Sequence, residues 1–259
     1  TALIVAATIG GVWPFAIIFS LILILGILEL EKLCKHDTPI PLFIPIMDIA
    51  GGLLLFLSLF FSYVRPEWNI NPISCYLPYL IIRLVSQLYI KEGNSLRMLA
   101  DSAMTQLIVA LPLSLLNILH FEPEQSTLLL SIFIFIWVND TGAYCIGSMF
   151  GKHRLFERIS PKKSWEGFFG GLAFTIIAGI LIAVFNSGFF PHFSTAVWIG
   201  LSIVVSIFAT WGDLVESLLK RTANVKDSGN ILPGHGGVLD RIDSLLLVIP
   251  AVLLYISLL

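Results

Sequence analysis

Long apolar stretches separated by short polar segments make up most of this chain. A helix needs roughly 20 residues to cross the hydrocarbon core of a bilayer, so each charge-free stretch of about that length predicts a membrane span. We expect roughly eight or nine spans, because a shortened stretch with Gly10, Gly11 and Pro14 precedes the first complete one. The complete spans are expected from about residue 15 to 28 and over 39–64, 73–91, 100–119, 127–150, 167–189, 195–219 and 241–259.

The composition agrees with this pattern. Of the 259 residues, 57% are hydrophobic and only 12% are charged, about half the charged share of a soluble domain. We therefore expect an all-α, polytopic integral membrane bundle. A net charge of -2 gives no basic excess for phosphates along a duplex, which argues against nucleic-acid binding. The three cysteines lie far apart with no CxxC, so neither a disulfide framework nor a zinc site is indicated.

Basic residues fall on alternate sides of consecutive spans. Every Lys and Arg except Arg65 and Arg83 lies in loops on one side, which the positive-inside rule makes cytoplasmic. We expect N-terminal helices over 1–91 and a catalytic transmembrane domain over 92–259, whose cytoplasmic loops 151–166 and 220–241 carry the chemistry. Compact spans and short loops favour a bacterial inner membrane, with an organellar or endoplasmic-reticulum membrane as the alternative. The chain begins at Thr1 without a basic n-region, so we expect a trimmed N-terminus and read no cleavable signal.

Several acidic residues lie within or beside these spans, where an ionised carboxylate costs roughly 2.5–3.5 kcal/mol and needs a partner. We expect Asp48 to make a hydrogen bond inside the helices or to pair with Arg83. Near the cytoplasmic end of another span, four polar residues share one helical face because they are spaced i, i+3, i+4 and i+7. They are Asp213, Glu216, Ser217 and Lys220; Asp240 and Asp243 are three apart in the next span.

Carboxylates from two such helices suit Mg²⁺, which completes its coordination with waters and substrate phosphates. The loop between the helices adds glycines, whose N–H groups can approach an anion closely, and several cations. The combination predicts a site for a metal-bound polyphosphate. Ion pairs at the helix ends, such as Asp213 with Lys220 and Asp240 with Arg241, are the alternative explanation. The loop residues concerned are Arg221, Lys226, Asp227, Gly234, His235, Gly236 and Gly237.

The loop at 151–166 has similar chemistry. It follows a span that contains Asp140, and Lys162 and Lys163 precede the next span. Positive charge that only sets the membrane topology would explain these lysines equally well.

The segments Ser217–Arg221, Lys226–Gly229 and Leu232–Asp243 together resemble the signature of the phosphatidate cytidylyltransferase (CDP-diacylglycerol synthase) family. Asn139–Tyr144 and Ser160–Gly167 are also similar to family segments. The resemblance implies an all-helical membrane enzyme that makes CDP-diacylglycerol and pyrophosphate from CTP and phosphatidic acid. It also implies a homodimer in the lipid bilayer and a requirement for Mg²⁺, with K⁺ as a candidate second ion.

On this resemblance we expect Asp213 and Asp240 to hold Mg²⁺, with Asp243 as a further ligand and Glu216 nearby. Ser217 and Asp227 belong to the same signature and are placed in the site. The remaining residues are expected to contact phosphates. The triphosphate would be neutralised by Lys220, Arg221, Lys226 and Arg241. Hydrogen bonds to a phosphate would come from Gly234, His235, Gly236 and Gly237. Either substrate would be bound by Lys162 and Lys163, and Asp140 would bind metal or orient a lysine.

Two other classes fit part of the pattern. A CTP-dependent lipid kinase would also place a nucleotide and acidic residues at a membrane surface, but it would release CDP. A cation-coupled transporter would use intramembrane carboxylates and glycine-interrupted spans. Carboxylates gathered at one membrane surface, among basic loops, favour an enzyme with a cytoplasmic substrate.

Overall fold

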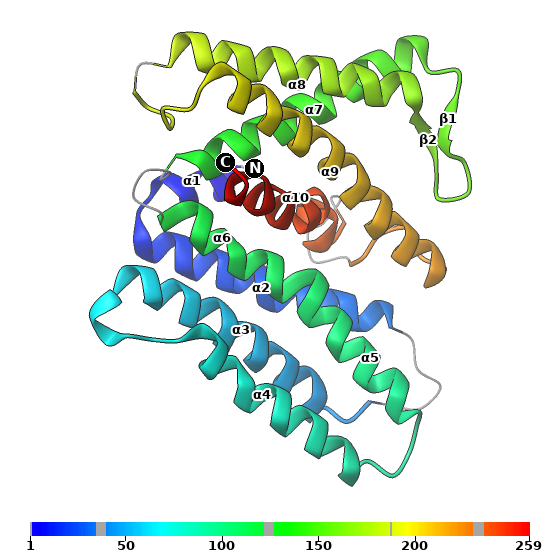
Figure 1. Ribbon diagram of the computed structural model, residues 1–259. Coiled ribbons are helices and arrows are strands. Elements are labelled where there is room, and N and C mark those ends of the chain that lie inside the picture. Colours follow the sequence, from blue (N-terminus) through cyan, green and yellow to red (C-terminus); the bar gives the residue numbers. More distant parts are fainter. Residues whose placement is uncertain (1, 35–39, 122–126, 187, 230–235) are drawn as a thin grey trace. The chain divides into compact units, whose positions relative to one another are not determined.

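The computed structural model describes residues 2–34, 40–121, 127–186, 188–229 and 236–259. These residues are mainly helical and form two compact units (Figure 1). The first unit combines Thr1–Phe121 with Ala223–Arg241, and the second combines Glu122–Thr222 with Ile242–Leu259. The sequence predicted a different division, with N-terminal helices over 1–91 and a catalytic domain over 92–259. That division is a functional one and stays a prediction.

In the first unit, helix α3 packs against α2, α4 and α6 (Figure 1). Gly11, with φ of +98°, separates the first two helices, and the Asn71 and Asn94 side chains cap α4 and α5. A π-helical turn over Gln106–Ala110 joins α5 to α6. The helices are α1 (Ala2–Ile9), α2 (Val12–Leu33), α3 (Phe43–Val64), α4 (Pro72–Ser86), α5 (Ser95–Thr105) and α6 (Leu111–Phe121), with 3₁₀ turns at Pro66–Trp68 and Gln87–Tyr89.

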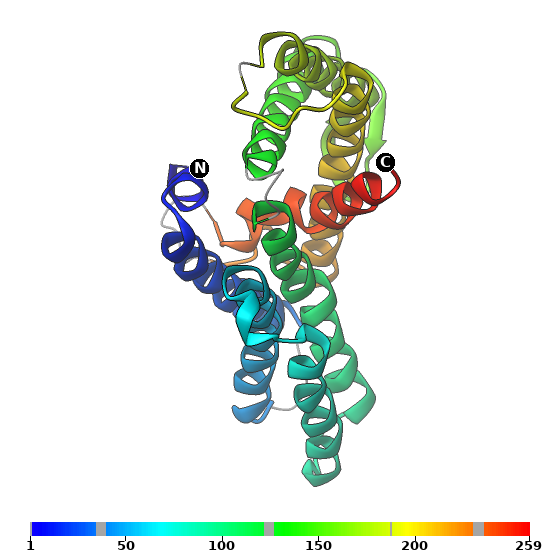
Figure 2. The ribbon, with the colours of Figure 1, turned by 60° about the vertical axis from the view of Figure 1, so that its left-hand side comes forward.

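The second unit contains α7 (Leu128–Phe150), α8 (Trp165–Phe185), α9 (Thr195–Thr222) and most of α10 (Leu239–Ser257). Helices α7, α8 and α9 all contact one another, as Figure 2 shows from a second direction. A two-stranded antiparallel hairpin of β1 (Arg154–Phe156) and β2 (Ser160–Ser164) joins α7 to α8. The sequence predicts a loop for this segment and an all-α fold, so the small sheet is an addition to the predicted helical bundle.

Six of the described helical segments are long and apolar enough to cross a membrane. They match six of the predicted spans, with the first one reaching Leu33 and not ending near residue 28. The extension contains Glu29, whose side chain is completely buried. The six segments are Val12–Leu33, Phe43–Val64, Ser95–Phe121, Leu128–Phe150, Trp165–Phe185 and Thr195–Thr222. The protein is therefore an integral membrane protein built from helices, and the predicted count of eight or nine spans is not reached by this criterion.

Small residues allow α7 and α8 to approach closely, as is common between membrane helices. A Cβ atom added at Gly171 would lie 2.8 Å from the backbone oxygen of Asn139 and 2.7 Å from its side-chain oxygen. One added at Gly167 would lie 2.9 Å from the backbone oxygen of Ala143. The two helix backbones lie so close together that neither position has room for a larger side chain.

We expect Gly171→Val to destabilise the protein by about 1–3 kcal/mol, because the larger side chain would push α8 away from the α7 backbone. Thermal unfolding in detergent measures the effect. Ala173→Val on the exposed side of the same helix is the control and should change the melting temperature little. Equal effects of the two substitutions would contradict the packing assignment.

Candidate active site

A pocket of about 590 Å³ opens in the second unit, between α7, the β1–β2 hairpin, the start of α8, and α9. Four of the residues predicted from three separate sequence segments line it: Asp140 on α7, Lys162 and Lys163 on β2, and Asp213 on α9. Arg154 on β1 also lines the pocket and was not among the predicted residues. The fold thus gathers acidic and basic groups into one cavity.

The hairpin is fastened to the start of α8. The Glu166 carboxylate accepts hydrogen bonds from the backbone N–H groups of Lys152 and His153, each at 3.2 Å, and it pairs with the His153 ring. Ser164 caps the helix by accepting from the Gly167 N–H at 3.1 Å. These contacts fix the end of β2, and with it the position of Lys163.

Lys163 forms an ion pair with one carboxylate and interacts electrostatically with two others. Its Nζ lies 2.6 Å from Oδ2 of Asp213, and Asp140 and Asp243 also interact electrostatically with both of these residues. Ser217 donates a hydrogen bond to the other oxygen of Asp213 at 3.2 Å. Asp213 remains partly exposed, with 36% of its side-chain surface accessible. Asp213 can offer a carboxylate oxygen to a cation that also binds water or phosphate, and Lys163 lies where its ammonium group can face a phosphate.

The C-terminal end of α9 carries further predicted residues. Glu216 is buried and forms an ion pair with Lys220 one turn later. The spacing had placed both residues on one face of the helix, but the pair expected there was Asp213 with Lys220. Arg221 is exposed and donates from Nε to the backbone oxygen of Ile159 in the hairpin, at 3.4 Å. This helix end and the hairpin are thereby linked in the same unit.

Asp240, at the start of α10, belongs to the first unit. Its Oδ2 accepts three hydrogen bonds: from the Ser228 N–H at 3.0 Å, the Ser228 hydroxyl at 2.9 Å and the Gly237 N–H at 2.8 Å. Gly236 has a φ of +80°, which favours glycine and allows this turn. The Gly237 N–H, predicted to contact a phosphate, is thus directed at Asp240.

Five other predicted residues belong to this segment. Lys226, Asp227 and Arg241 are exposed in the first unit. Gly234 and His235 lie outside the described residues.

Sequence reasoning missed Glu29 of α2, which belongs to the same unit as Asp240. Its carboxylate accepts hydrogen bonds from the N–H groups of Val238, at 2.9 Å, and Leu239, at 2.7 Å. The available signal was a charged residue directly after an apolar stretch, because such a residue needs a buried partner.

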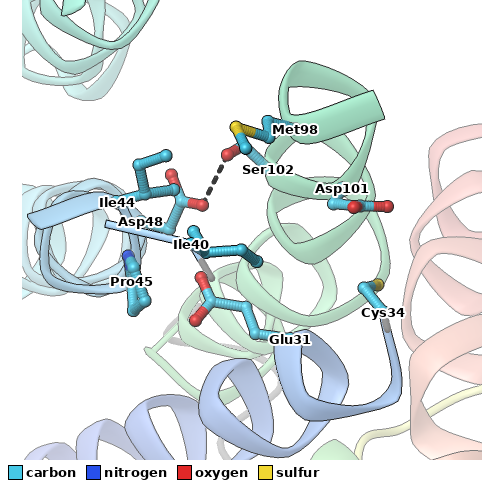
Figure 3. A pocket seen from close by; sticks show the side chains of 9 residues that line it. All are labelled: Glu31, Cys34, Ile40, Ile44, Pro45, Asp48, Met98, Asp101 and Ser102. Atoms are coloured by element: carbon cyan, nitrogen blue, oxygen red, sulfur yellow. Dashed lines mark hydrogen bonds between the residues drawn. The ribbon is translucent and has the colours of Figure 1, made fainter. Parts of the chain in front are cut away.

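A second, much smaller cavity of about 20 Å³ lies among α2, α3 and α5 (Figure 3). Asp48 accepts hydrogen bonds there from Ser102 at 2.6 Å and Tyr79 at 2.8 Å, and Arg83 Nε lies 3.6 Å from its carboxylate. The expected pairing of Asp48 with Arg83 is therefore confirmed. Because this network satisfies Asp48 within the helices, we assign it to the packing of the first unit.

The acidic side chains of the pocket fit one of the two ways in which proteins hold a metal ion. No three His, Cys, Asp or Glu side chains form a ready-made metal cage among the residues that the structure describes. Mg²⁺, however, is usually held by one or two carboxylates together with waters and substrate phosphates. The accessible oxygens of Asp213, beside Asp140 and Asp243, fit this second mode.

Comparisons with known proteins agree with this chemistry. Phosphatidate cytidylyltransferases from Staphylococcus aureus (strain COL) and Staphylococcus haemolyticus (strain JCSC1435) are 48% and 49% identical to the chain over 124 residues. The matched part is 47% of this chain and 46% of each relative, so it spans about half the length of these relatives. The model of the cytidylyltransferase family matches residues 1–259, the whole chain. The chain therefore belongs to the cytidylyltransferase family.

Proposed function

We propose that the protein is a phosphatidate cytidylyltransferase, which transfers the cytidylyl group of CTP to phosphatidic acid. The observation that carries the proposal is the pocket where Asp140, Lys162, Lys163 and Asp213 meet at the ends of apolar helices. The names of the staphylococcal relatives support the same reaction. A pocket in a membrane protein that is lined by charged side chains suits the meeting of a water-soluble triphosphate with a lipid headgroup.

The reaction that we propose is a direct displacement. An oxygen of the lipid phosphate attacks the α-phosphorus of CTP, and the bond from that phosphorus to the bridging oxygen of the β-phosphate breaks. The products are CDP-diacylglycerol and pyrophosphate. Because the attacking phosphate is already an anion at neutral pH, the protein must mainly position the reactants and neutralise their charge.

We propose that Asp213 and Asp240 hold Mg²⁺, with Asp243 as a further ligand and K⁺ as a candidate second ion. When bound, Mg²⁺ would offset negative charge on the triphosphate and on the leaving pyrophosphate. Lys163 bonds to Asp213 and so lies where it can bind a phosphate oxygen beside this carboxylate. Lys162 and Arg154 line the same pocket and add positive charge.

We assign Lys220, Arg221, Lys226 and Arg241 to the triphosphate and the pyrophosphate, and Gly236 and Gly237 to the turn that carries Asp240. Glu216 orients Lys220 through their ion pair. Ser217 orients Asp213 through its hydrogen bond. Asp140, Asp227, Gly234 and His235 complete the proposed site.

The proposal includes the arrangement in the membrane. We propose that α4, extended by the turn at Gln87–Tyr89, and α10 also cross the bilayer, which brings the complete spans to the expected eight. Charges at the start of α10 keep it outside the composition limit for a span. The site would face the cytoplasm of a bacterial inner membrane, and the enzyme would be a homodimer.

The test is pyrophosphate release by the purified protein in detergent, with and without phosphatidic acid, CTP and Mg²⁺. We expect release only when all three are present, with CDP-diacylglycerol identified by mass. Formation of CDP and a newly phosphorylated lipid would instead identify a lipid kinase. Folded protein that releases no pyrophosphate would overturn the proposal.

Lys163→Met should lower kcat/KM by roughly 10- to 100-fold, because a charge-assisted contact to phosphate contributes about 1.5–3 kcal/mol. The substitution keeps the apolar part of the side chain and removes the ammonium group beside Asp213. Lys162→Met is the matched control, since Lys162 is a neighbouring lysine that is exposed. Steady-state kinetics should show the larger loss for Lys163→Met, and equal losses would contradict the special position of Lys163.

A further inference from the structure

Glu29 is an acidic residue of a membrane-spanning helix whose side chain has no exposed surface. Its carboxylate contacts a segment about 200 residues later in the chain. Oε1 accepts from the Val238 N–H at 2.9 Å, and Oε2 accepts from the Leu239 N–H at 2.7 Å and from the Ser228 hydroxyl at 3.2 Å. Two backbone N–H donors and a hydroxyl within hydrogen-bond distance give both oxygens of this buried carboxylate a partner, which burial of a polar group requires.

Two of these donors belong to the beginning of a helix. Val238 and Leu239 stand at the start of α10, where backbone N–H groups have no acceptor within the helix. A carboxylate at this position also interacts favourably with the helix dipole. Glu29 of α2 therefore caps α10 from a distant part of the sequence.

The loop fits closely around the carboxylate. A Cβ atom added at Gly229 would lie 2.5 Å from Oε1 of Glu29, and one added at Gly237 would lie 2.5 Å from Oε2. Real Cβ atoms do not approach other atoms so closely, so both positions need glycine while Glu29 stays in place. Both glycines lie in the part of the sequence that resembles the family signature, whereas Glu29 lies outside it.

The same segment holds Asp240. The Ser228 hydroxyl lies within hydrogen-bond distance of Oε2 of Glu29 and Oδ2 of Asp240, and its single hydrogen can serve only one of them at a time. The Gly237 N–H, next to Val238, donates to Asp240. Residues fixed by Glu29 therefore also set the position of the Asp240 carboxylate.

We propose that Glu29 is a positioning residue that holds the Ser228 and Gly237–Leu239 segment so that Asp240 is oriented to bind a divalent cation. The proposal rests on the proposed function, in which Asp240 is a Mg²⁺ ligand. It gives the N-terminal helices a part in the active site, beyond anchoring the enzyme in the membrane.

Glu29→Gln tests the proposal, because the side chain keeps its shape while one oxygen becomes an NH₂ group. That NH₂ group cannot accept, so one of the two backbone N–H groups loses its acceptor. Glu31→Gln is the matched control: it is the same change in the same helix, and Glu31 lines the small cavity near Asp48 (Figure 3). We expect the Mg²⁺ concentration for half-maximal activity to rise roughly 10- to 100-fold in Glu29→Gln, as for other supporting residues of metal ligands. Glu31→Gln should leave it unchanged.

Two measurements do not depend on activity. Hydrogen exchange of backbone amides at Gly237–Leu239 should accelerate by about 10-fold or more in Glu29→Gln and stay unchanged in Glu31→Gln. Mn²⁺ binding to the purified protein, measured by electron paramagnetic resonance, should weaken in Glu29→Gln and stay unchanged in Glu31→Gln. Ser228→Ala is a second variant in case Glu29→Gln does not fold, and it should also weaken Mn²⁺ binding.

The outcomes separate the two proposals. If the wild-type protein shows no transferase activity but exchange and Mn²⁺ binding change as expected, the proposed function fails and the positioning role stands. If the wild-type protein is active and Glu29→Gln matches Glu31→Gln in exchange and in metal dependence, the positioning role is overturned. Unchanged Mn²⁺ binding in a folded Ser228→Ala protein would likewise contradict it.

Discussion

Asp213→Asn is expected to lower kcat by more than about 100-fold, since even residues that only support metal ligands contribute roughly 10- to 100-fold. The substitution removes the negative charge that faces the Lys163 ammonium group at 2.6 Å and that we assign to Mg²⁺. It also removes charge beside Asp140 and Asp243, so the cation site becomes weaker as a whole. Pyrophosphate release at saturating CTP and phosphatidic acid measures the effect.

The structure offers a control for this substitution. Glu157→Gln makes the same change from carboxylate to amide at an exposed position between β1 and β2, away from the pocket lining. It should retain nearly full activity. Asp213 is partly exposed, so its replacement should leave thermal unfolding nearly unchanged. An Asp213→Asn protein with more than a tenth of wild-type activity and the same Mg²⁺ dependence would exclude Asp213 as a ligand.

The membrane spans were predictable because a span must be both long and apolar, and both properties can be read from consecutive residues. The charge criterion ended the first complete span near residue 28, whereas the helix continues to Leu33. It continues because Glu29 has its own hydrogen-bond donors and so tolerates burial. Helix length here depends on partners that no local pattern contains.

The hairpin of β1 and β2 could not be predicted in the same way. Its strands are short, and the register shifts between Arg154 and Phe156, so no regular alternation of apolar and polar residues marks them. The segment is fixed by contacts with the start of α8, above all those of Glu166. Its lysines were nevertheless identified, because their charge beside a span is visible in the sequence.

In the candidate site, too, local features could be predicted from the sequence and contacts between distant segments could not. Spacing along one helix predicted that Asp213, Glu216 and Lys220 share a face, but it did not identify Glu216 as a partner of Lys220. Asp140, Lys163 and Asp213 come from three separate segments and line one pocket. Their similar chemistry and the family resemblance suggested this grouping, whereas spacing along the chain did not. Glu29 was missed because its partners are about 200 residues away, and spacing says nothing about contacts at that range.

Asp240→Asn should also lower kcat by more than about 100-fold, for the same reason as a lost metal ligand. We also expect the Asp240→Asn protein to fold as the wild type does. The amide oxygen of Asn can take the place of Oδ2 and accept from Ser228 and Gly237, so the hydrogen bonds of the turn can be kept while the charge is lost.

Asp240→Ala separates the charge of Asp240 from its structural role. It removes the acceptor of three hydrogen bonds, two of them from backbone N–H groups, and each unsatisfied buried group costs about 1–3 kcal/mol. We therefore expect thermal unfolding at a clearly lower temperature for Asp240→Ala and near the wild-type temperature for Asp240→Asn. Substantial turnover by a folded Asp240→Asn protein would show that the turn needs Asp240 and the reaction does not. If both variants lose turnover and only Asp240→Ala loses stability, the negative charge of Asp240 is required for the reaction.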